Sequence, residues 1–207
     1  IKTYYVISTI GFMILYSGLF TSIGSIVEAR RSGVLQLILS SPIKGYRIFI
    51  ARILAGLVSI LITSIAIILL GVALGADLYR IPAYTWISIA LLLLVGAVGT
   101  MGLGFMIAPF IRTPEAATAI ANMIAFPTMF LGGIAIPKFL LPSSIQIFAE
   151  TYPLSRIVDS IRNIAVYDWD IGQAIQYSAP AIAISIAVLI VGWILYRRAL
   201  EKALENP

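Results

Sequence analysis

The run IPAYTWISIALLLLVGAVGTMGLGFMIAPFI, residues 81–111, contains no Asp, Glu, Lys or Arg. A helix needs roughly 20 consecutive apolar residues to cross the hydrocarbon core of a bilayer, so this run is long enough to span a membrane. The composition of the whole chain agrees, because 60% of its 207 residues are hydrophobic and only 11% are charged, whereas soluble domains are about 25% charged. The sequence therefore predicts an all-α polytopic membrane protein.

Four further runs without charged residues lie on either side of this one. Together the runs predict five transmembrane helices in a single transmembrane domain covering residues 1–207, with spans over about 3–27, 53–76, 83–108, 116–136 and 173–196. The chain begins with Ile1 and enters its first apolar run at once. We expect from this abrupt start, and from the odd number of spans, that a first span precedes the given sequence.

The charged residues between the spans predict the topology. Alternating the spans places 28–52, 109–115 and 197–207 on one side, with nine basic and four acidic residues, whereas the other side has five of each. The positive-inside rule makes the first side cytoplasmic, in a multi-pass protein of the cell membrane whose C-terminus is cytoplasmic. The excess of basic over acidic residues then follows from the membrane topology and does not indicate nucleic-acid binding. Arg52 lies just inside its apolar run and is either an interfacial anchor or a functional intramembrane charge.

Several classes of chemistry lack their residues in this sequence. There is no Cys and no His, which removes the commonest nucleophile–base pairs and the commonest metal ligand, and we predict no metal site and no catalytic residues. No carboxylate falls within a predicted span, which disfavours an intramembrane enzyme, a proton-coupled pump and an acidic cation channel. No phosphate-binding loop of the Gly-x-x-x-x-Gly-Lys-Ser/Thr type occurs, so we expect the chain to bind no ATP itself.

The segment 137–170 is too apolar for a solvated loop, and Pro137, Pro142 and Pro153 interrupt it. Short apolar pieces broken by proline are typical of re-entrant or interfacial helices, which survive at membrane depth only where protein covers them or where they line a cavity. From Leu154 onward the pattern is amphipathic, with apolar residues at helical spacing on one face. The opposite face carries Arg156, Asp159, Ser160, Arg162 and Asn163. Asp159 and Arg162 are three residues apart and could pair. A plain surface helix lying on lipid is the alternative.

The segment 28–47, EARRSGVLQLILSSPIKGYR, combines charged residues with a short Leu-rich piece and the break Ser41-Pro42. A helix over 30–41 would gather Ser32, Gly33, Gln36 and Ser40 on one narrow polar face. Such an element can lie at the membrane surface and present polar atoms to a partner. An ordinary basic loop that satisfies the positive-inside rule is the alternative.

Taken in order, these motifs resemble the membrane subunits of ABC-2-type exporters, which are also called type V. The resemblance rests on three pieces of the C-terminal half, Phe126–Pro137, the Leu141-Pro142 step and Tyr152–Arg162. It also rests on segment 28–42, where a cluster of acidic and basic residues is followed by a glycine, a Leu-rich piece and a Ser-Pro step. Where many members have Thr-Leu-Glu after the glycine, this chain has Val34-Leu35-Gln36. The resemblance covers essentially the whole chain.

The resemblance implies six spans in the complete protein, a separate nucleotide-binding subunit that carries ATP and Mg²⁺, and a second permease copy, identical or related. It implies that segment 28–47 contains a coupling helix that contacts the ATPase subunit, through Glu28, Arg30, Arg31, Ser32, Gly33, Val34, Leu35, Gln36 and Pro42. By the same analogy, a substrate path would include Asn122, Pro127, Thr128 and Met129. The re-entrant segment would be formed around Gly132, Gly133, Pro137, Pro153, Leu154, Asp159 and Arg162.

The expected function is therefore ATP-driven export of an amphipathic or lipid-like substrate by a non-catalytic permease subunit embedded among membrane lipids. Two alternatives stay open. One is a sodium-extruding ABC permease, and the other is a membrane scaffold subunit that transports nothing.

Overall fold

The computed structural model describes residues 2–33 and 45–205, and every regular element in these ranges is a helix. In chain order the helices are α1 (Lys2–Arg31), α3 (Gly45–Ala73), η1 (Leu78–Arg80), α4 (Ala83–Ile107), η2 (Ala108–Phe110), α5 (Pro114–Leu131), η3 (Lys138–Leu140), α6 (Ser143–Thr151), α7 (Pro153–Tyr167) and α8 (Ile171–Glu205).

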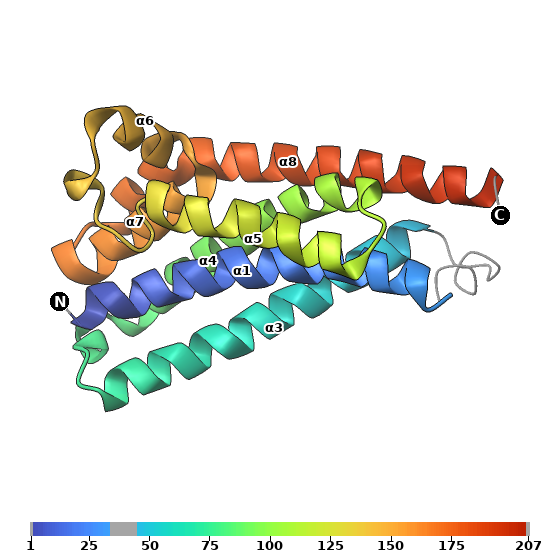
Figure 1. Ribbon diagram of the computed structural model, residues 1–207. Helices are drawn as coiled ribbons and strands as arrows, with labels where there is room; N and C mark the ends of the chain where they lie inside the picture. The colour runs from blue at the N-terminus through green and yellow to red at the C-terminus, as the bar shows by residue number, and fades with distance from the viewer. Residues whose placement is uncertain (1, 34–44, 206–207) are drawn as a thin grey trace.

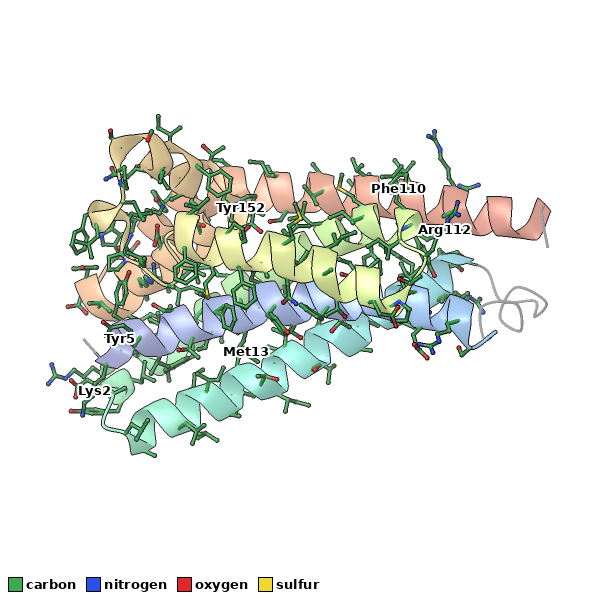
Figure 2. All side chains as sticks on the ribbon, viewed as in Figure 1. Lys2, Tyr5, Met13, Phe110, Arg112 and Tyr152 are labelled. Atoms are coloured by element: carbon green, nitrogen blue, oxygen red, sulfur yellow. The ribbon has the colours of Figure 1, made fainter. Side chains whose placement is uncertain are left out.

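The long helices α1, α3, α4, α5 and α8 run roughly along one direction and form an elongated bundle (Figure 1). The short helices α6 and α7 gather near the N-terminus of the chain, and the C-terminus lies at the opposite end. Lys2 and Tyr5 mark the first end, and Arg112 marks the second (Figure 2). We refer to these as the α6 end and the Arg112 end.

Four helices of the described residues are long and apolar enough to cross a membrane: Lys2–Ala29 in α1, Gly45–Ala73 in α3, Ala83–Phe110 across α4 and η2, and Ile171–Ala199 in α8. The apolar stretches of these four spans differ in how much of each is buried inside the bundle. The buried share is 56% in α1 and 61% in α4, but only 17% in α3 and 22% in α8. The centre of the bundle is therefore built from α1 and α4. The outward faces of α3 and α8 are apolar and exposed, as lipid-facing surfaces are.

The predicted span at 116–136 differs from the helix that the structure has there. α5 is 18 residues long, begins at Pro114 and ends at Leu131. Its end is set by Gly133, whose φ of +70° is left-handed and favours glycine. At about 1.5 Å per residue the helix covers only about 27 Å. α5 is not among the four candidate spans, so the predicted count of five is not confirmed.

Glycines let α4 and α8 approach closely. A Cβ atom at Gly102 would lie 2.8 Å from the backbone nitrogen of Leu189, and one at Gly192 would lie 2.7 Å from the carbonyl oxygen of Gly102. Both contacts involve backbone atoms, which cannot rotate away. Small residues at helix interfaces are the usual means of close packing in membranes, where lipid tails are as apolar as side chains.

An aromatic cluster joins three helices toward the Arg112 end. The Phe49 ring of α3 lies 4.7 Å from the Phe105 ring of α4 and 4.8 Å from the Trp193 ring of α8, between centroids. Tyr196 completes the group at 5.5 Å from Phe49. The first turns of α3 are thereby attached to the α4–α8 pair.

Candidate functional site

The helix α7 begins directly at Pro153, whose missing N–H is not needed in the first turn of a helix. Its apolar residues Leu154, Ile157, Val158 and Ile161 are buried, as the amphipathic pattern predicts. The opposite, polar face is largely buried as well, because Arg162 is only 3% exposed and Ser160 is fully buried. The polar side of α7 therefore faces protein.

Arg162 is the centre of a buried hydrogen-bond cluster. Its Nη1 atom donates to the carbonyl oxygen of Gly133 at 2.8 Å and to Oδ1 of Asp159 at 2.9 Å. Its Nη2 atom donates to Oγ of Ser8 at 2.7 Å and to the carbonyl oxygen of Ile134. The guanidinium also stacks over the Tyr4 ring, with its carbon 4.3 Å from the centroid. The planar fork of arginine suits such divergent acceptors.

The charge of Arg162 is balanced by one carboxylate. Asp159, one turn earlier on α7, pairs with Arg162 and also forms a salt bridge with Nζ of Lys138 in η3. One negative charge is thus shared between two cations in a largely buried setting. The carbonyl oxygens of Gly133 and Ile134 supply the remaining negative partial charge, which lowers the cost of burying the second cation.

The carbonyl groups that meet Arg162 are available because α5 ends at a tight turn. The N–H of Gly132 donates to the Thr128 carbonyl at 2.8 Å, and the N–H of Gly133 donates to the Phe130 carbonyl at 3.2 Å. A Cβ atom at Gly132 would lie 2.6 Å from Oγ of Ser155 in α7. The two glycines therefore serve the turn and its close contact with α7.

The contacts of α7 place it along the bundle. Arg162 meets Ser8, and one turn earlier Val158 lies against Gly11, so α7 runs antiparallel to α1. The beginning of α7 reaches α4, where the Leu154 side chain lies 2.9 Å from a Cβ position built at Gly96. With 15 residues, α7 covers about 22 Å from this deep contact back to the α6 end. The placement is that of a helix folded back into the bundle and covered by protein.

The four residues predicted for a substrate path do not share one surface of α5. Pro127 is exposed, Asn122 and Met129 are partly buried, and Thr128 is 6% exposed and faces the interior. The exposed side of α5 also carries Met123, Phe126 and Phe130. Helix α5 runs through Pro127 without a break.

The residues predicted for coupling lie at the Arg112 end as far as the structure describes them. Helix α1 continues to Arg31, and the N–H of Ser32 donates to the Glu28 carbonyl at 2.9 Å. Gly33, the fourth residue of the predicted helix over 30–41, has a φ of +71° and is not helical. The part of that helix from residue 34 onward lies outside the described residues and stays a prediction. The remaining members of the predicted set, Val34, Leu35, Gln36 and Pro42, lie outside the described residues.

A cavity of about 250 Å³ lies beside Glu28. It is formed where the last turns of α1 approach the first turns of α5, and Gly24, Pro114 and Thr118 line it together with the Glu28 side chain. The start of α5 is held by Thr113, whose Oγ1 accepts from the N–H of Ala116 at 3.2 Å, as an N-cap residue does.

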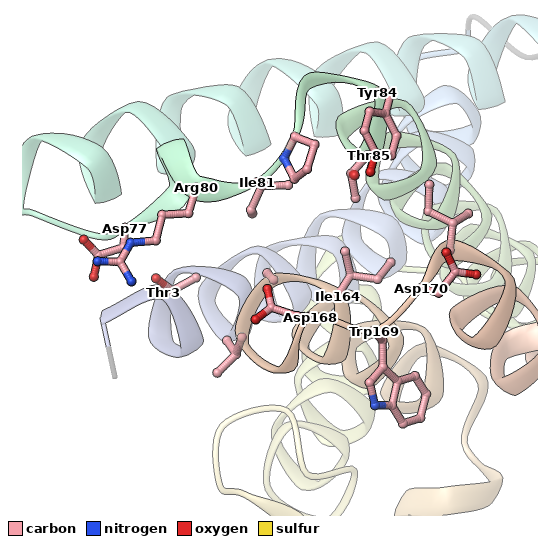
Figure 3. A pocket seen from close by; sticks show the side chains of 14 residues that line it. Thr3, Asp77, Arg80, Ile81, Tyr84, Thr85, Ile164, Asp168, Trp169 and Asp170 are labelled. Atoms are coloured by element: carbon pink, nitrogen blue, oxygen red, sulfur yellow. The ribbon is translucent and has the colours of Figure 1, made fainter.

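A cavity of about 480 Å³ lies at the α6 end and was not predicted from the sequence. Its polar lining comes from η1, α4 and the α7–α8 connection: Asp77, Arg80, Thr85, Asp168, Trp169 and Asp170 (Figure 3). The Tyr79 hydroxyl, and after it the Asp77 carboxylate, raise the pKa of the Arg80 guanidinium. With three carboxylates and one guanidinium, this lining favours a cationic over an anionic ligand.

The sequence left this cavity unpredicted because its residues are scattered over distant segments. Asp170 lies directly before the start of α8. There its Oδ2 accepts from the N–H of Gly172 at 2.9 Å, and its own N–H donates to Oε1 of Gln173 at 3.3 Å. One indication of this cavity was available in the sequence, because a charged residue lies next to each of two predicted spans.

Residues 1–197 match the family model described as ABC-2 family transporter protein. The chain belongs to the ABC-2 transporter family. It is also similar to the linearmycin resistance permease protein LnrN of Bacillus subtilis (strain 168), with 30% identity over 151 residues that cover 69% of this chain and 37% of that protein. The chain thus spans little more than a third of the length of this relative. No solved structure gives a significant match.

Family membership confirms the resemblance drawn from the motifs. It makes this chain part of the membrane subunit of an ABC transporter, a permease, and the four apolar helices agree with a multi-pass membrane protein.

Proposed function

We propose that this chain is the membrane-spanning part of an ATP-driven exporter. In this proposal a separate nucleotide-binding subunit hydrolyses ATP with Mg²⁺, and the permease moves an amphipathic or lipid-like substrate out of the cytoplasm. The family match over residues 1–197 carries the proposal. The linearmycin resistance permease of Bacillus subtilis, to which the chain is similar, supports export of a compound that is harmful to the cell.

We place the contact with the ATPase subunit at the Arg112 end, in the segment between α1 and α3. Both flanks of this segment are held in the bundle, since Ile26 and Ala29 of α1 and Phe49 of α3 belong to one buried cluster. A force applied between two anchored helix ends is transmitted to the helices rather than absorbed. The positive-inside rule supports a cytoplasmic location for this end.

We further propose that α5 crosses the membrane as a fifth span, shortened by the turn at Gly132 and Gly133, and that two permease copies enclose the path. The exposed apolar residues Met123, Phe126 and Phe130 give α5 a surface that a second copy or a missing span could cover. Asn122, Pro127 and Met129 stay candidates for the path along this helix, and the buried Thr128 would act on the shape of the turn.

The coupling proposal is tested at Gly33 with two matched variants. No atom lies within 4 Å of a Cβ position at Gly33, so a side chain there projects into open space within the described part of the chain. Gly33→Asn keeps access to the left-handed conformation, whereas Gly33→Arg adds bulk and charge. We expect co-purification with the ATPase subunit and substrate-dependent ATPase activity to fall sharply for Gly33→Arg and little for Gly33→Asn. Equal retention of both properties in the two variants would contradict the coupling assignment.

A further inference from the structure

An apolar cavity of about 190 Å³ lies between α4, α8 and the junction of α6 with α7. Gly99 and Leu103 of α4, Ser185 and Val188 of α8, and Tyr152 at the junction are among its lining residues. Among the residues that the structure describes, no charged one lines it. An ionic group would therefore enter without a counter-charge, and a neutral ligand is favoured.

Two hydroxyl groups at this cavity have no hydrogen-bond partner within the described part of the chain, those of Tyr152 and Ser185. Both hydroxyl oxygens are buried, and Ser185 is 0% exposed. The other hydroxyl of the lining, on Thr100, donates to the Ala97 carbonyl at 2.9 Å. Buried polar groups are nearly always hydrogen-bonded in folded proteins, so two orphaned donors beside one cavity point to an absent acceptor.

Ser185 contrasts with a neighbouring serine of the same helix. The hydroxyl of Ser178 is also fully buried, and it donates to the Ala174 carbonyl four residues earlier at 2.7 Å. This local bond is the common solution for a serine within a helix. The Ser185 hydroxyl instead approaches Gly99, where a Cβ atom would lie 2.5 Å from Oγ. The missing side chain of Gly99 is thus what leaves room for the Ser185 hydroxyl beside the cavity.

The cavity lies deep in the bundle. Gly99 is 16 residues after the first residue of α4, and Ser185 is 14 residues after the first residue of α8, which corresponds to about 24 and 21 Å along the two helices. Both residues lie near the centres of the candidate spans Ala83–Phe110 and Ile171–Ala199, so the midplane of a hydrocarbon core about 30 Å thick would lie near this level. The ester groups of bilayer lipids lie at the interface and do not reach this depth. The acceptor must therefore be carried within an apolar chain.

We propose that this cavity binds a neutral, mostly apolar molecule that carries a hydrogen-bond-accepting oxygen, such as a ketone, hydroxyl or ether, in the middle of its chain. The Tyr152 and Ser185 hydroxyls donate to this oxygen. The ligand enters past Ile184, which is 39% exposed at the rim on α8. That the molecule is a transported substrate rests on the proposed function; the binding site itself does not.

The test uses three photoreactive chains of equal length that carry the same diazirine. One has a ketone in the middle, one has a methyl ester at its end, and one is a plain alkyl chain. The protein is reconstituted in lipid nanodiscs, irradiated with each probe and mapped by mass spectrometry. We expect the mid-chain ketone to label cavity residues about fivefold more than the alkyl chain, because a neutral hydrogen bond contributes about that factor in binding.

Tyr152→Phe and Ser185→Ala should each lower labelling by the ketone probe by about twofold, should together remove its advantage over the alkyl chain, and should leave labelling by the alkyl chain unaffected. Ser178→Ala is the matched control, since it removes a buried hydroxyl of the same helix whose bond is internal. Equal labelling by ketone and alkyl chains, or no effect of either variant, would overturn the proposal. Strongest labelling by the terminal ester would assign the cavity to bilayer lipid and overturn it as well.

A second measurement separates a binding role of the two hydroxyls from a structural one. Without any probe, Tyr152→Phe and Ser185→Ala should unfold at the same temperature as the unmodified chain or higher, because each removes an unsatisfied buried donor. A lower unfolding temperature in both variants would mean that the hydroxyls are bonded in the protein, and the site would be rejected. Selective labelling in a chain that binds no ATPase subunit would support the site and reject only the proposed function.

Discussion

Replacing Arg162 by methionine tests how strongly the buried cluster stabilises the fold. The side chain of methionine fills similar space but leaves the carbonyl groups of Gly133 and Ile134, and Oγ of Ser8, without their donor. Asp159 keeps its salt bridge to Lys138. Removing one partner of a buried ion pair typically costs about 3–5 kcal/mol, and we expect the free energy of unfolding to fall by that amount.

Arg156→Met is the matched control, because Arg156 belongs to the same helix and makes comparable types of contact at a partly exposed site. Its Nε atom donates to the Tyr177 carbonyl at 2.5 Å, and its guanidinium carbon lies 4.4 Å from the centroid of the Tyr177 ring. Water can replace much of this contact, so we expect a loss of about 1 kcal/mol. Arg162→Lys should fall between the two, since one ammonium group cannot reach acceptors on three segments.

The assay is reversible unfolding in mixed micelles, followed through the three tryptophans of the chain. A second comparison with Asp159→Asn, alone and combined with Arg162→Met, gives the coupling energy of the pair in a double-mutant cycle. The reasoning would be refuted if Arg162→Met and Arg156→Met lowered the free energy of unfolding equally. Near-equal losses would mean that the contacts of Arg162 add nothing beyond those of an ordinary surface arginine.

Two further predictions follow from local geometry. Gly102→Ala should separate α4 from α8, since its Cβ would lie 2.8 Å from the backbone nitrogen of Leu189. We expect the free energy of unfolding to fall by about 1–3 kcal/mol in the same assay, and an unchanged midpoint would refute the close contact. Thr113→Ala removes the cap on the N–H of Ala116, and we expect the free energy of chemical unfolding to fall by about 1 kcal/mol. Thr118→Ala is the control, because Thr118 caps no N–H group, and we expect it to leave the free energy of unfolding unchanged.

Features that depend on near neighbours could be predicted from the sequence. The cap at Thr113 and the ion pair of Asp159 with Arg162 involve residues three positions apart, and both are present. The family, too, was recognisable, because its motifs are residue types in a fixed order. The apolar helices followed from the distribution of charge, although the end of α5 at Leu131 depends on a left-handed glycine that hydropathy does not reveal.

The partners of Arg162 could not be predicted in the same way. Gly133 and Ile134 accept through backbone carbonyls 29 and 28 residues away, and Ser8 lies 154 residues away. Backbone acceptors have no residue type, so no sequence pattern marks them. Amphipathic analysis also assumes that a polar face meets water. In α7 the polar face meets the end of another helix, and the assumption fails.

The same cluster constrains how the bundle can move. Arg162 connects three separate segments, α1 through Ser8, the end of α5 through Gly133, and α7 on which it lies. A motion that separated α5 from α7 would break several of these bonds in a buried site, at about 3–5 kcal/mol if the cost resembles that of losing the pair. A state that costs this much is populated at well under one per cent unless substrate or the ATPase subunit binds it preferentially. We therefore expect α1, α7 and the end of α5 to move as one body, so that a displacement at the Arg112 end reaches the α6 end through α1.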